Sequence, residues 1–222
     1  SVADDVERYG RIRVLVVEGG RDALMLQRQQ REDGLDRSGR RDQVSDHRLL
    51  GADGDGAGPL AEDPFELHAW AIAGLLDACE GLSAEQLAFG APGAFGTVMD
   101  TLRHLVEGDR FQLWAAGAGV PLTDASSMGS EQLRQVAAEN AAAWRGYIPA
   151  HPDGDERVVD IDDSGWKRTA TVGLRLAQAL QHGIEHRTQV CTAMTLLGLE
   201  TPDLSGWGYG VQRGVVSEVL PQ

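Results

Sequence analysis

The chain has 222 residues and a formal net charge of −14 at pH 7. This length is sufficient for one large domain, or for one domain with an appendage. The negative charge argues against nucleic acid and anionic membranes as partners, because binding to phosphate groups requires clustered Lys and Arg.

Two further features of the composition concern the membrane and the redox compartment. No apolar run approaches the ~20 residues that a membrane span requires. The apolar run nearest the N-terminus, Val14 to Val17, is too short for the core of a signal peptide. Cys79 and Cys191 both lie in helical patterns, which favours small buried core residues over a disulfide framework. We therefore expect a cytoplasmic protein that acts on a small molecule.

The composition changes near residue 60. Residues 1–58 contain half of the Lys and Arg of the chain, no Trp or Phe, and a Gly- and Asp-rich end. Such a segment cannot bury enough apolar surface to offset its chain entropy. We predict that residues 1–58 form a disordered or loosely structured extension, with one possible short strand at residues 11–17. The change in composition also raises the hypothesis that this segment lies upstream of the natural protein.

Residues 62–222 are predicted to form the main domain, with four amphipathic helices. The predicted helices cover about residues 64–79, 97–116, 130–147 and 173–197. Asp63 and Ser130 are suited to N-cap positions, and Ser83 with Gln86 predicts the capping box of a short turn. After the fourth helix, residues 211–220 have only a weak helical or strand pattern.

A β-hairpin is predicted between the third and fourth helices. Its strands cover residues 157–161 and 166–172, and residues 162–165 form the turn. This long connection implies a crossover instead of a simple up-and-down arrangement. The predicted fold class is therefore all-α, a four-helix bundle with a crossover connection that carries a small β-hairpin.

His182 and His186 are the most informative residues of the chain. Their i, i+4 spacing places both imidazoles on one side of a helix, where they could bind a divalent metal. His104 in the second predicted helix could supply a third ligand. Three His ligands leave one metal position open, as in catalytic sites. A chance His pair on an exposed helix is the alternative, and His47, His68 and His151 are interpreted as structural residues.

The apolar pattern of the fourth helix predicts the surroundings of the pair. The apolar stripe of the fourth helix is predicted to consist of Leu176, Leu180, Ile184, Cys191 and Met194. His182 and His186 would then lie at the edge of the buried surface. Arg187 is interpreted as half of an ion pair between helices. Asp100 and Glu107 either orient a ligand His or belong to a solvated acidic face.

Six short segments have an order and spacing that are specific when taken together. They are residues 67–70, 81–87, 92–97, 101–106, 180–189 and 197–203. From residue 64 to about residue 210 the chain resembles the DinB/YfiT-like family. The resemblance implies a four-helix bundle with a divalent metal, often zinc or nickel, bound by His104, His182 and His186. One departure is Thr188, where the family usually has Gly.

The resemblance also implies a reaction. Some members of the family are transferases that use the metal to ionise a low-molecular-weight thiol. Arg replaces Lys almost everywhere except at Lys167, which indicates GC-rich coding and suggests mycothiol as the thiol. The alternatives are a non-catalytic metal- or ligand-binding bundle of the stress-response type that associates as a homodimer, and a metal-dependent hydrolase that uses bound water. No phosphate-binding loop, dinucleotide fingerprint, nucleophile elbow or HExxH motif is present.

Overall fold

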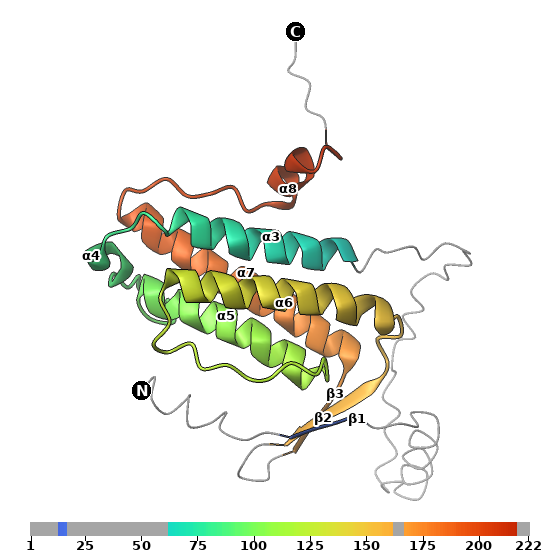
Figure 1. The fold of residues 1–222 in the computed structure, drawn as a ribbon. Helices are drawn as coiled ribbons and strands as arrows, with labels where there is room; N and C mark the ends of the chain where they lie inside the picture. The colour runs from blue at the N-terminus through green and yellow to red at the C-terminus, as the bar shows by residue number, and fades with distance from the viewer. Residues whose placement is uncertain (1–12, 17–61, 162–166, 217–222) are drawn as a thin grey trace, which may run out of the picture.

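The computed structural model describes residues 13–16, 62–161 and 167–216, and four long helices lie side by side in it (Figure 1). These helices are α3 (Glu62–Ala78), α5 (Val98–Ala115), α6 (Ser130–Ala150) and α7 (Val172–Leu196). Two short helices, α4 (Ala84–Leu87) and α8 (Gly206–Gln212), flank them. The predicted helical bundle is confirmed. No helix among the described residues is long and apolar enough to cross a membrane.

The order of the helices in the bundle differs from their order along the chain. α5 packs against α6 and α7, and α3 packs against the same two helices. This arrangement puts α6 and α7 at opposite corners of the bundle, although they are consecutive long helices in the sequence. The connection through the strands therefore crosses one end of the bundle, as predicted (Figure 1).

Capping residues explain where the helices begin. The Thr97 hydroxyl accepts a hydrogen bond from the Asp100 N–H, and the Asp100 carboxylate accepts one from the Thr97 N–H, which completes a capping box at α5. The predicted box of Ser83 with Gln86 is also present. Thr171 caps α7 through its hydroxyl alone, which accepts a hydrogen bond from the Leu174 N–H.

Two helix ends differ from the prediction. Gly129 is the N-cap of α6, so Ser130 is the first helical residue, and α3 begins one residue before Asp63. α6 also continues through Pro149 to Ala150. A proline in the last turn removes one backbone donor, and packing of the buried Tyr147 and Ile148 holds this turn in place.

The sheet contains one strand more than the hairpin. β2 (Arg157–Ile161) and β3 (Lys167–Thr171) pair antiparallel, and residues 162–166 between them lie outside the described residues. β1 (Arg13–Val16) pairs antiparallel with the other edge of β2, giving the order β1-β2-β3. The short strand predicted at residues 11–17 is thus present over four residues. The disorder predicted for residues 1–58 otherwise falls outside the described residues and stays a prediction.

The interior of the bundle is divided by a polar layer. One apolar cluster, which includes Leu75, Leu105 and Met194, lies toward the α4 end. A second, which includes Trp144 and Val158, lies toward the sheet. Between the two clusters each long helix contributes a buried polar residue, namely His68, Asp109, Asn140 and Arg187. This layer lies at the same level as the predicted metal ligands on α5 and α7.

The buried face of α7 corrects the predicted stripe. Ile184 is 52% exposed, and Leu176 and Leu180 are only half-buried. The buried face instead includes Ala179, Gly183, His186, Arg187 and Val190. Of the predicted stripe, Met194 is buried. Hydrophobicity alone failed for the earlier turns of the helix, because a small residue such as Gly183 is buried to leave space for a neighbouring side chain. A Cβ atom at Gly183 would lie 2.2 Å from Cε1 of His68.

Candidate metal centre

Three imidazoles from two helices converge on one point. His104 comes from the middle of α5, and His182 and His186 come from successive turns of α7. One nitrogen of each ring lies within 4.8 Å of those of the other two. The Nε2 atoms of His104 and His182 are 3.2 Å apart. Two nitrogens that bind one tetrahedral zinc ion at about 2 Å are separated by about 3.3 Å.

A glutamine on the same helix sets the orientation of His186. Nδ1 of His186 lies 3.0 Å from Oε1 of Gln189, one turn further along α7. The backbone N–H of Phe95 donates to the same oxygen at 3.1 Å. Because this oxygen can only accept, Nδ1 of His186 carries the proton and Nε2 is the available ligand atom. Hydrogen bonds of this kind fix the tautomer of metal-binding histidines.

Phe95, in the loop before α5, covers the imidazole of His104. The Phe95 ring stacks on His104 with ring centroids 3.8 Å apart and planes within 10°. The Phe95 ring lies nearly perpendicular to that of His186, with ring centroids 5.9 Å apart. Phe95 therefore contacts one imidazole through its face and supports another through the Gln189 hydrogen bond. No role was predicted for Phe95 or Gln189 from the sequence. Both residues could have been found from the sequence, because Gln189 lies one helical turn after His186 and Phe95 lies two residues before Thr97, the N-cap of α5.

The electrostatics of the cluster favour metal binding. Burial, and then the neighbouring His186 and His104, lowers the pKa of His182 to about 3. This imidazole is therefore neutral at pH 7, which is the form that binds a metal. The site has uncharged nitrogen ligands, a nitrogen–nitrogen spacing that matches a tetrahedral ion, and a hydrogen bond that orients one ligand. These properties suit a borderline-soft divalent ion.

Gly108 provides the space that His182 occupies. A Cβ atom at this position would lie 2.2 Å from Cε1 and 2.7 Å from Nε2 of His182. We expect Gly108→Ala to displace this imidazole and to weaken binding of zinc at least about tenfold, measured by competition with a chromophoric chelator. The matched control is Gly146→Ala on α6, where a Cβ would meet nothing within 4 Å. The control should bind zinc unchanged and gain about 0.5–1 kcal/mol in stability. Equal zinc affinity for both variants would contradict the close packing at Gly108.

A cavity of about 680 Å³ opens beside the cluster. His104 and His182 form part of its wall, together with faces of α5 and α7, β3 and the loop between α5 and α6. Its size is that of a site for a small organic molecule. The imidazole cluster is thus accessible to a ligand from one side.

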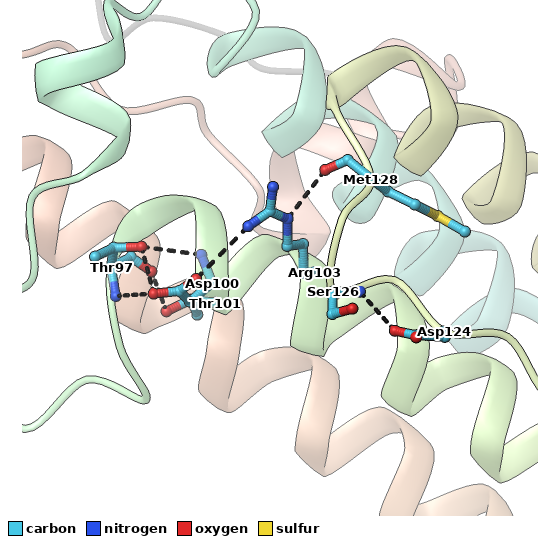
Figure 2. A network of polar contacts seen from close by, with 7 residues as sticks. All are labelled: Thr97, Asp100, Thr101, Arg103, Asp124, Ser126 and Met128. Carbon is cyan, nitrogen blue, oxygen red and sulfur yellow. Dashed lines mark hydrogen bonds and ion pairs between the residues drawn. The ribbon is translucent and has the colours of Figure 1, made fainter. Parts of the chain in front are cut away.

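The loop between α5 and α6 is attached to α5 by polar contacts (Figure 2). Nε of Arg103 donates to the Met128 carbonyl at 3.0 Å, and its guanidinium lies 3.7 Å from the Asp100 carboxylate. Within the loop, the Ser126 N–H donates to Asp124 at 2.9 Å. These contacts position the cavity wall that this loop contributes.

Most of the chain matches one known protein family. The model of the DinB family matches residues 63–211, which is more than half of the chain. The chain belongs to the DinB family. It is similar to a DinB-like protein from Bacillus cereus ATCC 10987 whose crystal structure is solved. The similarity has 19% sequence identity and a TM-score of 0.49, and it covers 62% of this chain and 91% of that chain. None of the curated proteins compared with the chain matches it.

The acidic residues near His104 in this DinB bundle have separate roles. Asp100 completes the α5 cap and pairs with Arg103, and neither contact involves a ligand histidine. Glu107 is half-buried and lines the cavity. Burial, followed by the nearby Asp124, raises the pKa of Glu107. The interpretation as a solvated acidic face is therefore wrong for Glu107.

Behind the cluster, four buried side chains connect all four long helices of the DinB bundle. Asp109 on α5 accepts from Nε2 of His68 at 3.1 Å and from Nε1 of Trp144 at 2.9 Å. Nη1 of Arg187 donates to Nδ1 of His68 at 3.1 Å. Arg187 thus donates to an imidazole on α3, and Asp109, which bonds the other nitrogen of that ring, supplies the opposite charge without a direct ion pair. Burial lowers the pKa of Arg187 to about 10, so the guanidinium remains charged at pH 7.

Proposed function

We propose that His104, His182 and His186 bind a divalent metal ion, zinc or nickel, and that the protein is a transferase that activates a low-molecular-weight thiol such as mycothiol. The observation that carries this proposal is the convergence of three imidazoles, two of which line a cavity of about 680 Å³. When bound, such an ion lowers the pKa of a thiol or a water molecule that it coordinates and so supplies a nucleophile at neutral pH.

The side chains of the chain itself would bind and orient the reactants. Gln189 holds His186 with Nε2 toward the cluster, and Phe95 fixes the plane of His104. The protein's own thiols are poor nucleophiles, since burial and then Cys191 raise the pKa of Cys79 to about 11, and burial also raises the pKa of Cys191. An exogenous thiol in the cavity is therefore the better candidate for the reacting sulfur.

A hydrolase is the second candidate. Glu107, a carboxyl group in the cavity wall whose pKa is raised, has the properties of a group that accepts a proton from water. The small-molecule substrate, a homodimer and a cytoplasmic location remain predictions that accompany either proposal.

An assay that varies the thiol separates these functions. Zinc- and nickel-loaded protein is incubated with a panel of electrophiles, with mycothiol, with another small thiol and with no thiol. A transferase should consume thiol and electrophile in equal amounts, at least about 100-fold faster with metal than after chelation. A hydrolase should turn over its substrate without any thiol. Protein that binds metal but gives no metal-dependent turnover across the panel would contradict both catalytic proposals and favour the non-catalytic binding bundle.

A further inference from the structure

A histidine on α3 packs against the turn of α7 that carries two of the proposed metal ligands. This residue, His68, is only 2% exposed. A Cβ atom at Gly183, the residue after His182, would lie 2.2 Å from Cε1 of His68. Arg187, the residue after His186, donates to Nδ1 of His68 at 3.1 Å. Each ligand on α7 is therefore followed directly by a residue that contacts the same buried imidazole.

The same imidazole is bonded to α5, the helix that carries the third ligand. Nε2 of His68 lies 3.1 Å from the carboxylate of Asp109, which is five residues after His104. The residue before Asp109 is Gly108, which makes room for His182. Burial lowers the pKa of His182, and Asp109 opposes that change, so the carboxylate lies within electrostatic range of this ligand. His68 thus connects the two helices that carry the cluster.

The hydrogen bonds of His68 determine which nitrogen carries the ring proton. The guanidinium of Arg187 can only donate, so Nδ1 of His68 is an acceptor. Nε2 therefore carries the proton and donates it to Asp109. Turning the ring by half a revolution would place carbon atoms against both partners. The two bonds accordingly fix the tautomer and the orientation of the ring, with one nitrogen directed to each helix.

Metal binding by this cluster depends on the relation between α5 and α7. All three nitrogens must lie about 2 Å from one ion, within about 0.2 Å. Helix geometry fixes His182 relative to His186, because both belong to α7. Neither helix by itself fixes the distance of this pair from His104. A rigid buried ring that is bonded to both helices restricts their separation and their rotation.

We propose that His68 is a positioning residue of the metal centre, whose two hydrogen bonds hold α5 and α7 where the three imidazoles can meet one ion. His68 acts through Asp109 and Arg187 and contacts neither the ion nor the substrate. This inference rests on the proposed function for its effect on metal binding. The arrangement of the imidazoles in metal-free protein tests it separately.

The first measurement is zinc affinity, determined by competition with a chromophoric chelator. His68→Leu removes both hydrogen bonds and should bind zinc at least about tenfold more weakly than the wild type, as is usual when groups that orient metal ligands are removed. In His68→Gln the amide nitrogen takes about the place of Nε2 and can still donate to Asp109. This conservative variant should have an intermediate zinc affinity.

Trp144→Phe is the matched control. Trp144 is 1% exposed and donates to the same carboxylate of Asp109 at 2.9 Å, but it lies on α6, which carries none of the three ligands. The control should lose stability, which urea unfolding measures, and keep the zinc affinity of the wild type. Lower stability alone leaves the affinity unchanged while nearly all of the protein is folded, because the apparent Kd increases only as the folded fraction decreases.

Cobalt serves as a spectroscopic probe of the ligand geometry, because its visible absorption depends on the number and arrangement of its ligands. The spectrum should change in both His68 variants and match the wild type in Trp144→Phe. Equal zinc affinities and identical cobalt spectra in all folded proteins would overturn the inference. A loss of affinity in Trp144→Phe as large as that in His68→Leu would also overturn it. If His68→Leu does not fold, His68→Gln is compared with Trp144→Phe by the same criteria.

Metal-free protein separates a failure of this inference from a failure of the metal centre. The ring centroid of His104 lies 5.0 Å from that of His182 and 4.6 Å from that of His186, so we expect nuclear Overhauser effects between these rings. The effects should weaken in His68→Gln and persist in Trp144→Phe. Unchanged effects in His68→Gln would refute positioning by His68. Wild-type protein that shows these effects but binds neither zinc nor cobalt would refute the metal centre alone.

Discussion

Replacing His182 and His186 together with Ala is expected to reduce the zinc or nickel bound by the purified protein from about one equivalent to almost none. The two residues supply two of the three converging imidazoles, and His104 alone cannot retain the ion. The measurement is metal content by mass spectrometry on protein without an affinity tag, because a His tag would itself bind nickel.

His151→Ala is the control for this experiment. His151 lies at the end of α6, where its Nδ1 is 2.8 Å from the Tyr147 carbonyl, and it belongs to no cluster of metal-ligating residues among those described. It should bind as much metal as the wild type. Equal metal content in all three proteins would show that the ion is held elsewhere. If wild-type protein remained metal-free after soaking with zinc or nickel, the proposed metal centre would be refuted.

Replacing Asp109 with Ala is expected to lower the free energy of unfolding by about 3–5 kcal/mol. The carboxylate is only 4% exposed and accepts hydrogen bonds from His68 and Trp144. Its removal leaves the buried charge of Arg187, 8% exposed, without a compensating anion and leaves two buried donors without acceptors. Urea unfolding, followed by circular dichroism, measures the change.

Two further variants separate the buried charge from a general effect of losing a carboxylate. Asp109→Asn retains an oxygen acceptor and should fall between wild type and Asp109→Ala. Asp77→Ala removes an exposed carboxylate that pairs with Arg134 on another helix, and should cost less than about 1 kcal/mol. If Asp109→Ala lowered the free energy of unfolding as little as Asp77→Ala, this result would contradict a structural role of the polar layer.

Local patterns were sufficient to predict most elements of the fold. The helices were predicted from apolar periodicity, and their starts from capping residues such as Ser83. The errors came from residues whose role depends on distant partners. Pro149 remains helical because Tyr147 and Ile148 are packed into the core, and Gly183 is buried because its missing side chain leaves room for His68. Neither contact is visible in the adjacent sequence.

The candidate site was predictable to a similar extent. The i, i+4 spacing of His182 and His186 places both rings on one face of a helix whatever surrounds them. The polar layer was not predictable, because His68 and Asp109 are 41 residues apart in the chain and each resembles an ordinary core or surface residue when considered alone.

The sequence by itself determined four amphipathic helices, the hairpin and the pairing of two histidines on the last long helix, because these depend on interactions within a few residues. Only the tertiary structure decided that His104 joins that pair, that Gly108 makes room for His182, and that Arg175 pairs with Asp160. Each of these depends on which faces of α5, α7 and the sheet pack together. That choice is made by the shape and burial of the whole bundle, in which a glycine or a buried arginine contributes as much as an apolar side chain.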